Sequence, residues 1–394
     1  MKWKNRGEEF LKLKDNILKK RVYIYGAGDY GKKLFERMRI VRDQIVFIDG
    51  NKKKQKEGYC NRAVIPPERL SFELIENAIL VVAASENNTA IIIKKLLLMG
   101  LEENRDFFRY RTFIDVFLPI YLYYSVNKVY FQDITILVTE RCSLRCKKCA
   151  PMYPYLKNPR HRTLEQVKAD LDQLFTHVDY VWDLIFTGGE PFIHPQFYDI
   201  IKYTINNYME KFGHIQIISN GTVVPKTEIL EIMAGRRKDL YVSVSNYMPF
   251  LKSGCLKRKF SECIRSFNEY KVSYELNGSE NWVDFGFADN IKTSKKIEDK
   301  QYLSRFFDDC NSSCRAFYKG HFIYCVPAFY SDIAINDKEE MDYDNDNFYF
   351  PEGSAELLEW SLGFNNKGYL DMCKLCNGYI TINSNFIKPA EQLV

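Results

Sequence analysis

Short apolar runs alternate with helical patterns along most of this chain, and this alternation favours an α/β fold. Near the amino terminus, the strand-like run RVYIY precedes the glycine turn GAGDYG, a helical pattern and a second strand-like run that ends at Asp49. A third apolar run, residues 78–84, precedes another helical pattern. The alternation continues to about residue 110 and predicts half of a doubly wound, Rossmann-like domain.

A second and longer alternation begins with ITILV at residues 134–138. Further strand candidates are VWDLIF, HIQIIS, DLYVSVS and YKVSYEL, with helical patterns between them. One helix start is well marked, because Thr163 and Gln166 have capping-box spacing before apolar residues at helical intervals. Repeated βα units of this kind predict a partial (β/α)6 barrel, whose active site lies at the carboxyl ends of the strands.

Two regions break these alternations. The apolar stretch FIDVFLPIYLYY contains Asp115 and Pro119 and is too short to span a bilayer, so we expect a buried linker. From about residue 305, cysteine, aromatic and acidic residues show little periodicity, which predicts a small domain held by metal. We therefore expect a Rossmann-like domain over 1–112, a linker over 113–132, the barrel over 133–304 and a cluster-binding domain over 305–394.

Composition argues against several classes of function. The 394 residues carry a formal charge of +5 without a concentrated basic stripe, so nucleic acid is not an expected partner. The first twenty residues scatter lysine and acid through every turn, so we expect no secretory signal and a cytoplasmic protein. In that compartment the 11 cysteines favour metal ligation or chemistry over a disulfide framework.

Three cysteines lie close together directly after the first barrel strand. Cys142, Cys146 and Cys149 have the spacing CxxxCxxC, which lets a short loop place three sulfurs around one face of a compact metal centre. A four-iron cluster has four iron corners, so three local thiolates leave one iron open for another ligand. A structural zinc ion is the alternative, since cysteine-rich loops also bind zinc through four protein ligands.

The next strand ends in a second motif, LIFTGGEPFIHP. Gly188 and Gly189 allow close approach of the backbone to a ligand, and the carboxylate of Glu190 can accept hydrogen bonds from an ammonium group. Alone, the motif could be an ordinary strand-to-loop turn. Its place one βα unit after the cysteine loop makes a cofactor site the stronger interpretation.

Across residues 133–276, the sequence resembles the radical S-adenosylmethionine (SAM) enzymes in its motifs and their order. The resemblance implies that Cys142, Cys146 and Cys149 bind a [4Fe-4S] cluster whose open iron is chelated by SAM. It also implies that one electron cleaves the sulfonium to methionine and a 5'-deoxyadenosyl radical. A flavodoxin- or ferredoxin-type protein would be the electron donor.

The same resemblance assigns SAM-binding residues to the ends of several strands. These are Gly188, Gly189, Glu190, Pro191, Ser219, Asn220, Ser243 and Ser245. The alternative for Ser219, Asn220, Ser243 and Ser245 is that they are polar groups at strand ends whose hydrogen bonds are formed within the fold. One departure from the family is Lys148, because many members have an aromatic residue just before the third cysteine, where it packs near adenine.

Four later cysteines resemble those of the twitch domain, the shorter relative of the SPASM domain, which carries one auxiliary [4Fe-4S] cluster. The expected ligands are Cys314, Cys325, Cys373 and Cys376, with Gly320 between the first two. Cys310 is the alternative to Cys314, and structural zinc is the alternative to a second cluster. The acidic run at Asp342 lacks the pattern of a calcium loop and is expected to be a solvated loop.

The amino-terminal glycines form GxGxxG between a strand and a helix, and Asp49 ends the next strand. Gly26, Gly28, Gly31 and Asp49 are therefore candidates for binding a nucleotide pyrophosphate and ribose. The region resembles small Rossmann-type domains of bacterial surface-sugar biosynthesis proteins, which implies a nucleotide or nucleotide-sugar ligand. The alternative is an empty scaffold or docking module.

The leading functional hypothesis is a radical SAM enzyme that oxidises, epimerises or rearranges a carbohydrate or nucleotide-linked sugar, with polysaccharide biosynthesis as its setting. A radical SAM maturase of a ribosomally made peptide is the second hypothesis. A zinc-stabilised binding protein without SAM chemistry is the third. No residue identifies a catalytic acid or base, although an epimerase would need a hydrogen donor such as Cys255 or Cys263.

Overall fold

The structure is a computed structural model that describes residues 21–286, 297–312, 314–329, 348–364 and 366–393. The chain divides after Gln132 into two compact units, each of which is described by itself. The acidic run at Asp342 lies outside the described residues. Among the helices that the structure describes, none is both long and apolar enough to cross a membrane.

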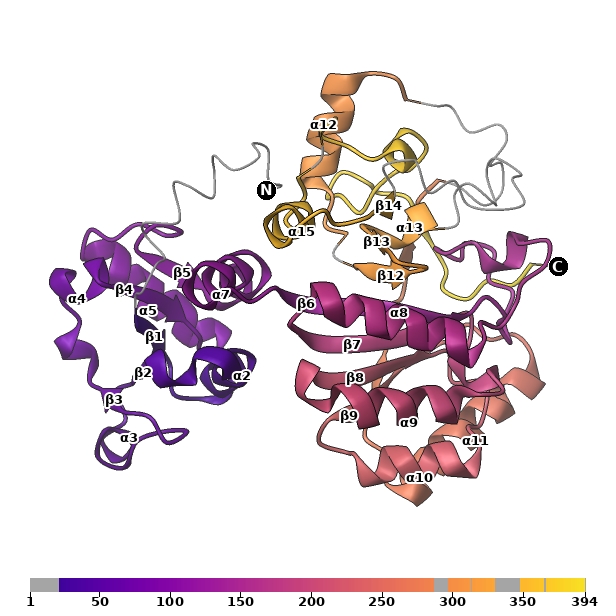
Figure 1. Ribbon diagram of the computed structural model, residues 1–394, viewed down its shortest axis with the longest axis horizontal. Coiled ribbons are helices and arrows are strands. Elements are labelled where there is room, and N and C mark those ends of the chain that lie inside the picture. Colours follow the sequence, from indigo (N-terminus) through magenta and orange to yellow (C-terminus); the bar gives the residue numbers. More distant parts are fainter. Residues whose placement is uncertain (1–20, 287–296, 313, 330–347, 365, 394) are drawn as a thin grey trace. The chain divides into compact units, whose positions relative to one another are not determined.

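The amino-terminal unit contains a five-stranded sheet in the order β3-β2-β1-β4-β5, and its four strand pairs are all parallel. This order is that of the doubly wound dinucleotide-binding fold. Its centre is apolar, with Ile24, Phe47 and Leu80 buried. The strands are β1 (Arg21–Tyr25), β2 (Ile45–Ile48), β3 (Val64–Ile65), β4 (Ala78–Val82) and β5 (Phe107–Arg109), and the helical segments are α2 (Asp29–Arg37), η1 (Arg39–Gln44), α3 (Lys52–Glu57), η2 (Pro67–Arg69), α4 (Phe72–Glu76) and α5 (Glu86–Leu98) (Figure 1).

The stretch expected to be a linker is helical and belongs to this first unit. It forms α6 (Tyr110–Thr112), the π-helical segment η3 (Phe113–Phe117) and α7 (Leu118–Val126). Pro119 is the second residue of α7, which directly follows the π-helical segment, so the irregular helical turn lies where proline cannot donate a backbone hydrogen bond. The apolar residues bury as expected, including Phe113 and Tyr121, but as helical core rather than as an extended connection.

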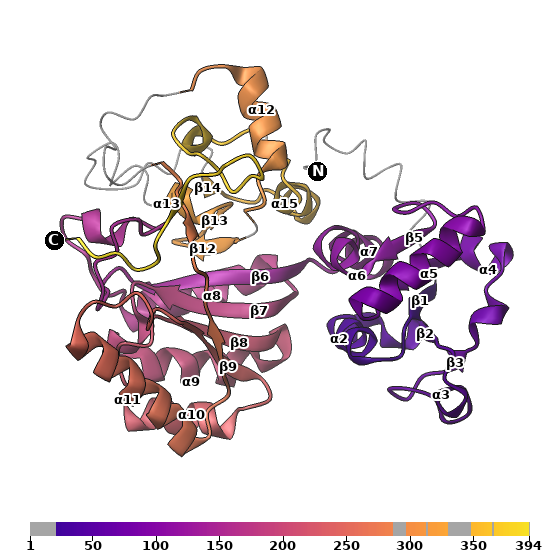
Figure 2. The same ribbon diagram turned by 180° about the vertical axis from the view of Figure 1, so that it is seen from behind.

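The second unit contains an eight-stranded sheet in the order β10-β9-β8-β7-β6-β12-β13-β14. The pairs β7–β8, β8–β9 and β9–β10 are parallel. Figures 1 and 2 show helices α8, α9 and α10 along one face of this sheet. The strands are β6 (Tyr130–Thr139), β7 (Tyr180–Gly188), β8 (Phe212–Ser219), β9 (Leu240–Ser245) and β10 (Tyr274–Asn277), and the helices between them are α8 (Leu164–His177), α9 (Phe197–Tyr208), α10 (Thr227–Gly235) and α11 (Gly254–Tyr270).

This arrangement is a partial barrel of five successive strands, with α/β order as predicted. Within the described residues, the strand added at the other edge comes from the carboxyl-terminal region, since β12 (Ala316–Tyr318) pairs in parallel with β6. β13 (His321–Ile323) and β14 (Phe348–Tyr349) then continue the sheet in antiparallel pairs. The expected sixth βα unit is thus replaced in the described sheet by a hairpin from the cysteine-rich region.

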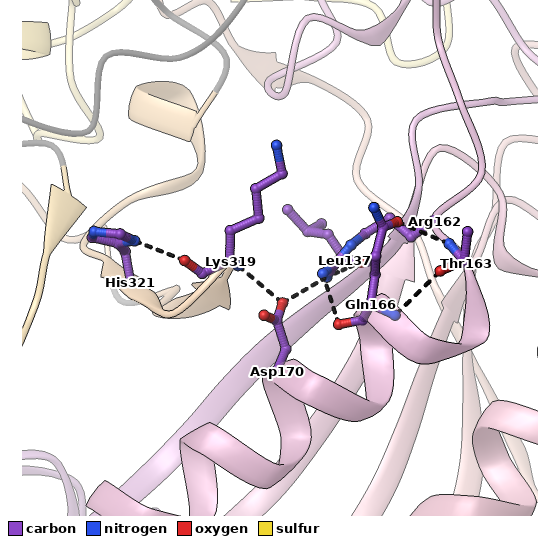
Figure 3. Close-up of polar contacts among 7 residues, drawn as sticks. All are labelled: Leu137, Arg162, Thr163, Gln166, Asp170, Lys319 and His321. Carbon is purple, nitrogen blue, oxygen red and sulfur yellow. Dashed lines mark hydrogen bonds and ion pairs between the residues drawn. The ribbon is translucent and has the colours of Figure 1, made fainter.

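A buried ion pair fastens this hairpin to the barrel (Figure 3). Arg162 donates from Nη1 to Asp170 Oδ2 at 2.7 Å and to the carbonyl oxygen of Leu137 at 3.2 Å. The backbone N–H of Lys319, in the hairpin turn, donates to the same Asp170 oxygen at 3.1 Å. The guanidinium also lies over the ring of Tyr318, 4.5 Å from its centroid. Both charges are therefore satisfied by bonds that tie α8, β6 and the hairpin together.

The remaining described elements surround the hairpin or lie near the sheet ends. Trp282 and Val283 of β11 pair antiparallel with Ile387 and Phe386 of β15. This pairing brings the segment after β10 against the carboxyl-terminal segment. The elements are η4 (Tyr153–Tyr155), η5 (Pro191–Ile193), η6 (Met209–Lys211), β11 (Trp282–Val283), α12 (Lys300–Asp309), α13 (Val326–Phe329), α15 (Ser354–Ser361), η8 (Asp371–Lys374) and β15 (Phe386–Ile387).

Candidate active site

The three-cysteine loop follows β6, and all three thiols line one cavity of about 460 Å³. Gly188 and Gly189 line the same cavity from the end of β7, and Ser219, Asn220 and Ser245 line it from the ends of β8 and β9. The carboxyl ends of parallel strands meet at one edge of a sheet, which is why motifs far apart in the sequence come together here.

The two glycines let the β7 turn pack directly against the cysteine loop. Gly188 has φ +155°, and a Cβ there would lie 2.1 Å from the carbonyl oxygen of Thr139. A Cβ at Gly189 would lie 2.0 Å from the carbonyl oxygen of Arg141. Two backbone bonds fix the contact, from Gly189 N–H to Thr139 O and from Glu190 N–H to Arg141 O, both 2.9 Å. The glycines thus hold the loop that carries the cysteines.

Glu190 has a different environment from the one expected of a SAM ligand. Its side chain is fully buried and is not among the described residues that line the cavity. The carboxylate accepts from Ser219 Oγ at 3.0 Å, from Asn220 N–H at 2.8 Å and from Phe192 N–H at 3.1 Å. Burial raises the pKa of Glu190 to about 7, against the lowering effect of these bonds. Its observed role is to join the ends of β7 and β8.

Two other predicted residues also lie outside the described cavity lining. Pro191 is buried in the short turn η5. Ser243 accepts a 2.7 Å hydrogen bond from Asn277 Nδ2 on the neighbouring strand. For Ser243 the alternative interpretation, a satisfied polar group at a strand end, therefore describes the structure better than ligand binding.

The thiols of the cysteine loop suit a cationic metal cluster. Burial raises the pKa of Cys142 and Cys149 to about 12 and that of Cys146 to about 11, so bound iron would have to supply the charge that stabilises the thiolates. Two amides already donate to sulfur, Asn220 Nδ2 to Cys142 at 3.4 Å and Gln392 Nε2 to Cys146 at 3.5 Å. Such bonds are the outer contacts that stabilise and tune iron–sulfur clusters.

Among the residues that the structure describes, no three cysteine, histidine, aspartate or glutamate side chains are grouped to hold a single metal ion. A [4Fe-4S] cluster binds each cysteine at a different iron and does not require such a grouping. The cysteine loop and its cavity therefore fit a four-iron cluster, with Cys142, Cys146 and Cys149 as the residues that would hold it.

The carboxyl-terminal segment braces the cysteine loop, a contact that no spacing in the sequence indicates. The N–H of Lys147 donates to Glu391 O at 2.6 Å, and the N–H of Leu393 donates to Arg145 O at 2.7 Å. The side chain of Gln392 accepts from the N–H of Arg145 at 2.7 Å and donates to the Cys146 sulfur. The cysteine loop, which follows the first strand of the second unit, is therefore also held by the last described residues of that unit.

The opposite wall of the cavity is aromatic and polar. The ring of Tyr247 packs against that of Trp282, with centroids 5.4 Å apart. Sequence reasoning missed this wall, because its residues come from loops and from the two-residue strand β11, which are too short for a recognisable spacing. Its members are Tyr247, Ser279, Asn281, Trp282, Val283, Phe285 and Tyr379.

Lys148, the departure from the family pattern, also lines this cavity. Its ammonium group forms a 3.1 Å ion pair with Asp284, and both side chains are mostly buried. Asp284 in turn anchors the carboxyl-terminal segment, because its carbonyl oxygen accepts from Asn377 and Asn383, each at 3.2 Å. Aromatic contact in the cavity is thus available from Tyr247 and Trp282 instead of from position 148.

The later cysteines show one correction to the expected ligand set. Cys325, Cys373 and Cys376 line a second, apolar cavity together with Cys310. Cys314 lines a different cavity, beside Thr135 and Leu137. The structure thus groups Cys310, rather than the preferred Cys314, with the other three thiols, because Cys310 directly follows α12 and lines their cavity. Phe285 and Tyr379 line both this cavity and the main one.

The glycine turn of the amino-terminal unit is closed by its own side chains. Asp49, the residue expected to bind ribose, accepts from the N–H of Ala27 at 2.8 Å and from the N–H of Asn51 at 2.9 Å, so its carboxylate caps the glycine turn instead. Lys54 Nζ donates to the carbonyl oxygen of Ala27. Gly26 and Gly31 are required by packing, since a Cβ at Gly31 would lie 1.9 Å from Gly26 O, whereas one at Gly28 would meet nothing within 4 Å.

Comparison with known families agrees with this geometry. Residues 136–272 match the model of the Radical SAM superfamily. These residues span β6 to the end of α11 and contain the cysteine loop and the GGEP turn. Residues 136–272 of the chain therefore form a radical SAM domain.

Relatives and solved structures show more distant likeness. The chain is 30% identical over 115 residues to the antilisterial bacteriocin subtilosin biosynthesis protein AlbA of Bacillus subtilis (strain 168), which covers 28% of this chain and 23% of AlbA. The match thus spans about a quarter of that relative. BtrN in complex with AdoMet and 2-DOIA is similar at 16% identity and TM-score 0.37, over 63% of this chain and 93% of BtrN. Streptococcus suis SuiB bound to S-adenosylmethionine is similar at 17% identity and TM-score 0.32, over 50% of this chain and 45% of SuiB.

Proposed function

We propose that this enzyme abstracts a hydrogen atom from a carbohydrate or nucleotide-linked sugar and so starts its oxidation, epimerisation or rearrangement. The observation that carries the proposal is the shared cavity. Three cysteine thiols, the glycine turn and a wall of aromatic and uncharged polar side chains all open onto it. When bound, the cluster and SAM supply one-electron cleavage of the sulfonium to methionine and a 5'-deoxyadenosyl radical, which leaves as 5'-deoxyadenosine after taking the substrate hydrogen.

The residues of the site have distinct proposed roles. Cys142, Cys146 and Cys149 hold the cluster, and Asn220 donates to the Cys142 sulfur. Polar groups at the ends of β7, β8 and β9 orient SAM. These are the backbone of Gly188 and Gly189 and the side chains of Ser219, Asn220 and Ser245. Glu190 acts indirectly, by fixing Ser219 and the N–H of Asn220.

The opposite wall suits a sugar. Trp282 and Tyr247 offer ring faces and edges to the C–H surface of a pyranose, while Ser279 and Asn281 offer hydrogen bonds to hydroxyl groups. Of the residues that line this cavity, Lys148 is the charged one, and it is paired with Asp284. The strand order of the amino-terminal sheet, which is that of dinucleotide-binding domains, supports a nucleotide-linked substrate.

The second cysteine set would hold an auxiliary [4Fe-4S] cluster. Cys310, Cys325, Cys373 and Cys376 supply four thiols, enough to occupy every iron. Phe285 and Tyr379 line both this cavity and the main one, so an electron leaving an oxidised substrate would have a short route to the auxiliary cluster. A structural zinc ion at these thiols is the alternative.

A peptide substrate is the second candidate, and the similarity to AlbA is the observation that favours it. One experiment separates the two. Formation of 5'-deoxyadenosine by the reconstituted, reduced enzyme is measured with a nucleotide-sugar fraction and with a peptide fraction from the same cells. We expect stimulation by the nucleotide sugars. Stimulation by peptides alone would contradict the sugar proposal and make the amino-terminal unit a docking module.

A further inference from the structure

A short segment, residues 284–286, lies between the two cysteine sets and is bonded on both sides. Toward the cysteine loop, one oxygen of the Asp284 carboxylate pairs with Lys148 Nζ at 3.1 Å. The other oxygen accepts from the N–H of Gly286 at 2.9 Å, which fixes the carboxylate in place. Lys148 belongs to the cysteine loop and directly precedes its third cysteine. The ion pair therefore joins this segment to the loop that would hold the first cluster.

The same segment is bonded to the chain around the second cysteine set. The carbonyl oxygen of Asp284 accepts from the side-chain amides of Asn377 and Asn383, each at 3.2 Å. The N–H of Asn377 donates to the carbonyl oxygen of Phe285 at 2.8 Å. Asn377 directly follows Cys376, one of the four thiols that line the second, apolar cavity. A continuous set of bonds thus runs from one cysteine set to the other.

The ion pair is shielded enough from water to position this segment. The side chains of Lys148 and Asp284 are only 15% and 19% exposed, and shielded pairs are screened by salt much less than exposed ones. Removal of one partner would leave the other charge partly desolvated and without its main compensation. Lys374, which lies between two cysteines of the second set, pairs instead with Asp371, three residues before it. That pair is local, whereas the pair of Lys148 joins distant parts of the chain.

We propose that Lys148 is a positioning residue that holds the substrate wall and the second cysteine set against the cysteine loop. This inference rests on the proposed function, in which the wall contacts substrate and both sets hold clusters. The neighbours of Asp284 in the sequence, Val283 and Phe285, both line the main cavity, and Phe285 also lines the second one. A shift of Asp284 would therefore move the substrate wall and the boundary of the second set together.

The role depends on the residue type at position 148. An aromatic residue, which the resembling family often has there, could not form an ion pair with Asp284. The link is thus a property of this chain, and it requires a long cationic side chain. Arginine can keep the pair, whereas methionine has a similar length but no charge.

The test compares K148M with K147M, the same substitution at the neighbouring position of the same loop. Both variants remove one positive charge beside the first cysteine set, and K148M also removes the partner of Asp284. The N–H of Lys147 donates to Glu391 O, and its carbonyl oxygen accepts from Tyr155, so both bonds survive K147M. K148R and D284N complete the series. Thermal unfolding and circular dichroism report the folding of each variant.

The first readout is hydrogen–deuterium exchange of the anaerobically reconstituted enzyme, measured by mass spectrometry on peptides that contain the N–H groups of Asp284 and Asn377. We expect these groups to exchange about tenfold faster in K148M and in D284N than in the unchanged enzyme. K147M should stay near the unchanged enzyme, and K148R should restore protection. K148M/D284N should exchange no faster than either single variant, because both substitutions remove one shared interaction.

The second readout is the release of iron from the second cysteine set to a chelator. It is measured on the background C142A/C146A/C149A, where the remaining iron belongs to the second set. K148M should speed this release several-fold, although position 148 belongs to the other cysteine loop. K147M on the same background should leave the rate unchanged.

Equal exchange in K148M and the unchanged enzyme would overturn the proposal. Equal acceleration in K148M and K147M would also overturn it, because the effect would then be a general loosening of the cysteine loop. A K148R variant that exchanges as fast as K148M would show that the ion pair is not the link. The proposed function fails by a separate result: the unchanged enzyme would form no 5'-deoxyadenosine with a chemical reductant, whatever the exchange rates.

Discussion

The two cysteine sets of the second unit are assembled in different ways. Cys142, Cys146 and Cys149 come from one loop, which the ends of β6 and β7 hold through backbone bonds. Cys310, Cys325, Cys373 and Cys376 come from separate segments that meet in an apolar cavity with Phe306 and Met372. The first set depends on local spacing at a sheet edge, whereas the second depends on tertiary packing. A sequence therefore reveals the first far more completely than the second.

The largest expected effect comes from removing the first set. The triple variant C142A/C146A/C149A should lose all SAM cleavage and keep about half of its iron, because a second four-iron site would remain filled. The measurements are 5'-deoxyadenosine by chromatography and iron per chain. If cleavage persists in the folded variant, SAM chemistry does not occur at this loop.

The second prediction tests which thiol completes the later set. C310A should lose most of the iron that remains in the triple variant, since Cys310 shares a cavity with the other three thiols. C314A is the matched control and should keep it, because Cys314 lines another cavity. Iron and sulfide are measured in each variant on the triple-alanine background. Loss of iron in C314A with retention in C310A would restore the original assignment.

These two sets show what the sequence could and could not predict. CxxxCxxC and GGEP directly follow two successive predicted strands. The strand pattern and the order of the strands are therefore enough to predict that Cys142 and Gly189 lie close together. The choice between Cys310 and Cys314 needed the end of α12 and the fold of the hairpin, because four residues of spacing do not say which thiol faces inward. Likewise, Trp282 lies in the two-residue strand β11 and Tyr379 in a loop, and no periodicity marks either as part of a binding surface.

Other differences have equally local causes. Glu190 and Ser243 have suitable chemistry for a ligand, but partners within the fold already use their polar groups. Asp49 is similar: the sequence predicts that it binds a ribose hydroxyl, but the N–H groups of Ala27 and Asn51 use both of its carboxylate oxygens. The stretch 113–124 is largely buried, as the sequence predicts, but the pattern around Asp115 and Pro119 does not reveal that it is helical.

The third prediction tests the backbone contact that holds the first set. In G189A the new Cβ would lie 2.0 Å from Arg141 O and 2.9 Å from Cys142 Cβ, so the cysteine loop must shift. We expect several-fold less SAM cleavage and loss of iron from the first set alone. G254A is the control, because a Cβ there meets nothing within 4 Å and alanine is the better helix former. Normal iron content in G189A would mean that the turn does not support the loop.

The smallest expected effect concerns the brace from the carboxyl-terminal segment. Q392A removes the 2.7 Å bond from the N–H of Arg145 and the 3.5 Å bond to the Cys146 sulfur. The loss of about one net hydrogen bond is worth roughly 1 kcal/mol, so iron should leave the first set a few-fold faster during chelator challenge. The iron of the second set should leave at an unchanged rate. Equal acceleration at both sets would show a general loss of stability instead.

Metal and sulfide analysis of the anaerobically reconstituted, unaltered enzyme tests the central claim most directly. Two cluster sites of different construction predict roughly eight irons and a matching amount of acid-labile sulfide per chain. Zinc without sulfide would contradict the account, since the cysteine sets would then be structural metal sites and the radical SAM domain would lack its cofactor.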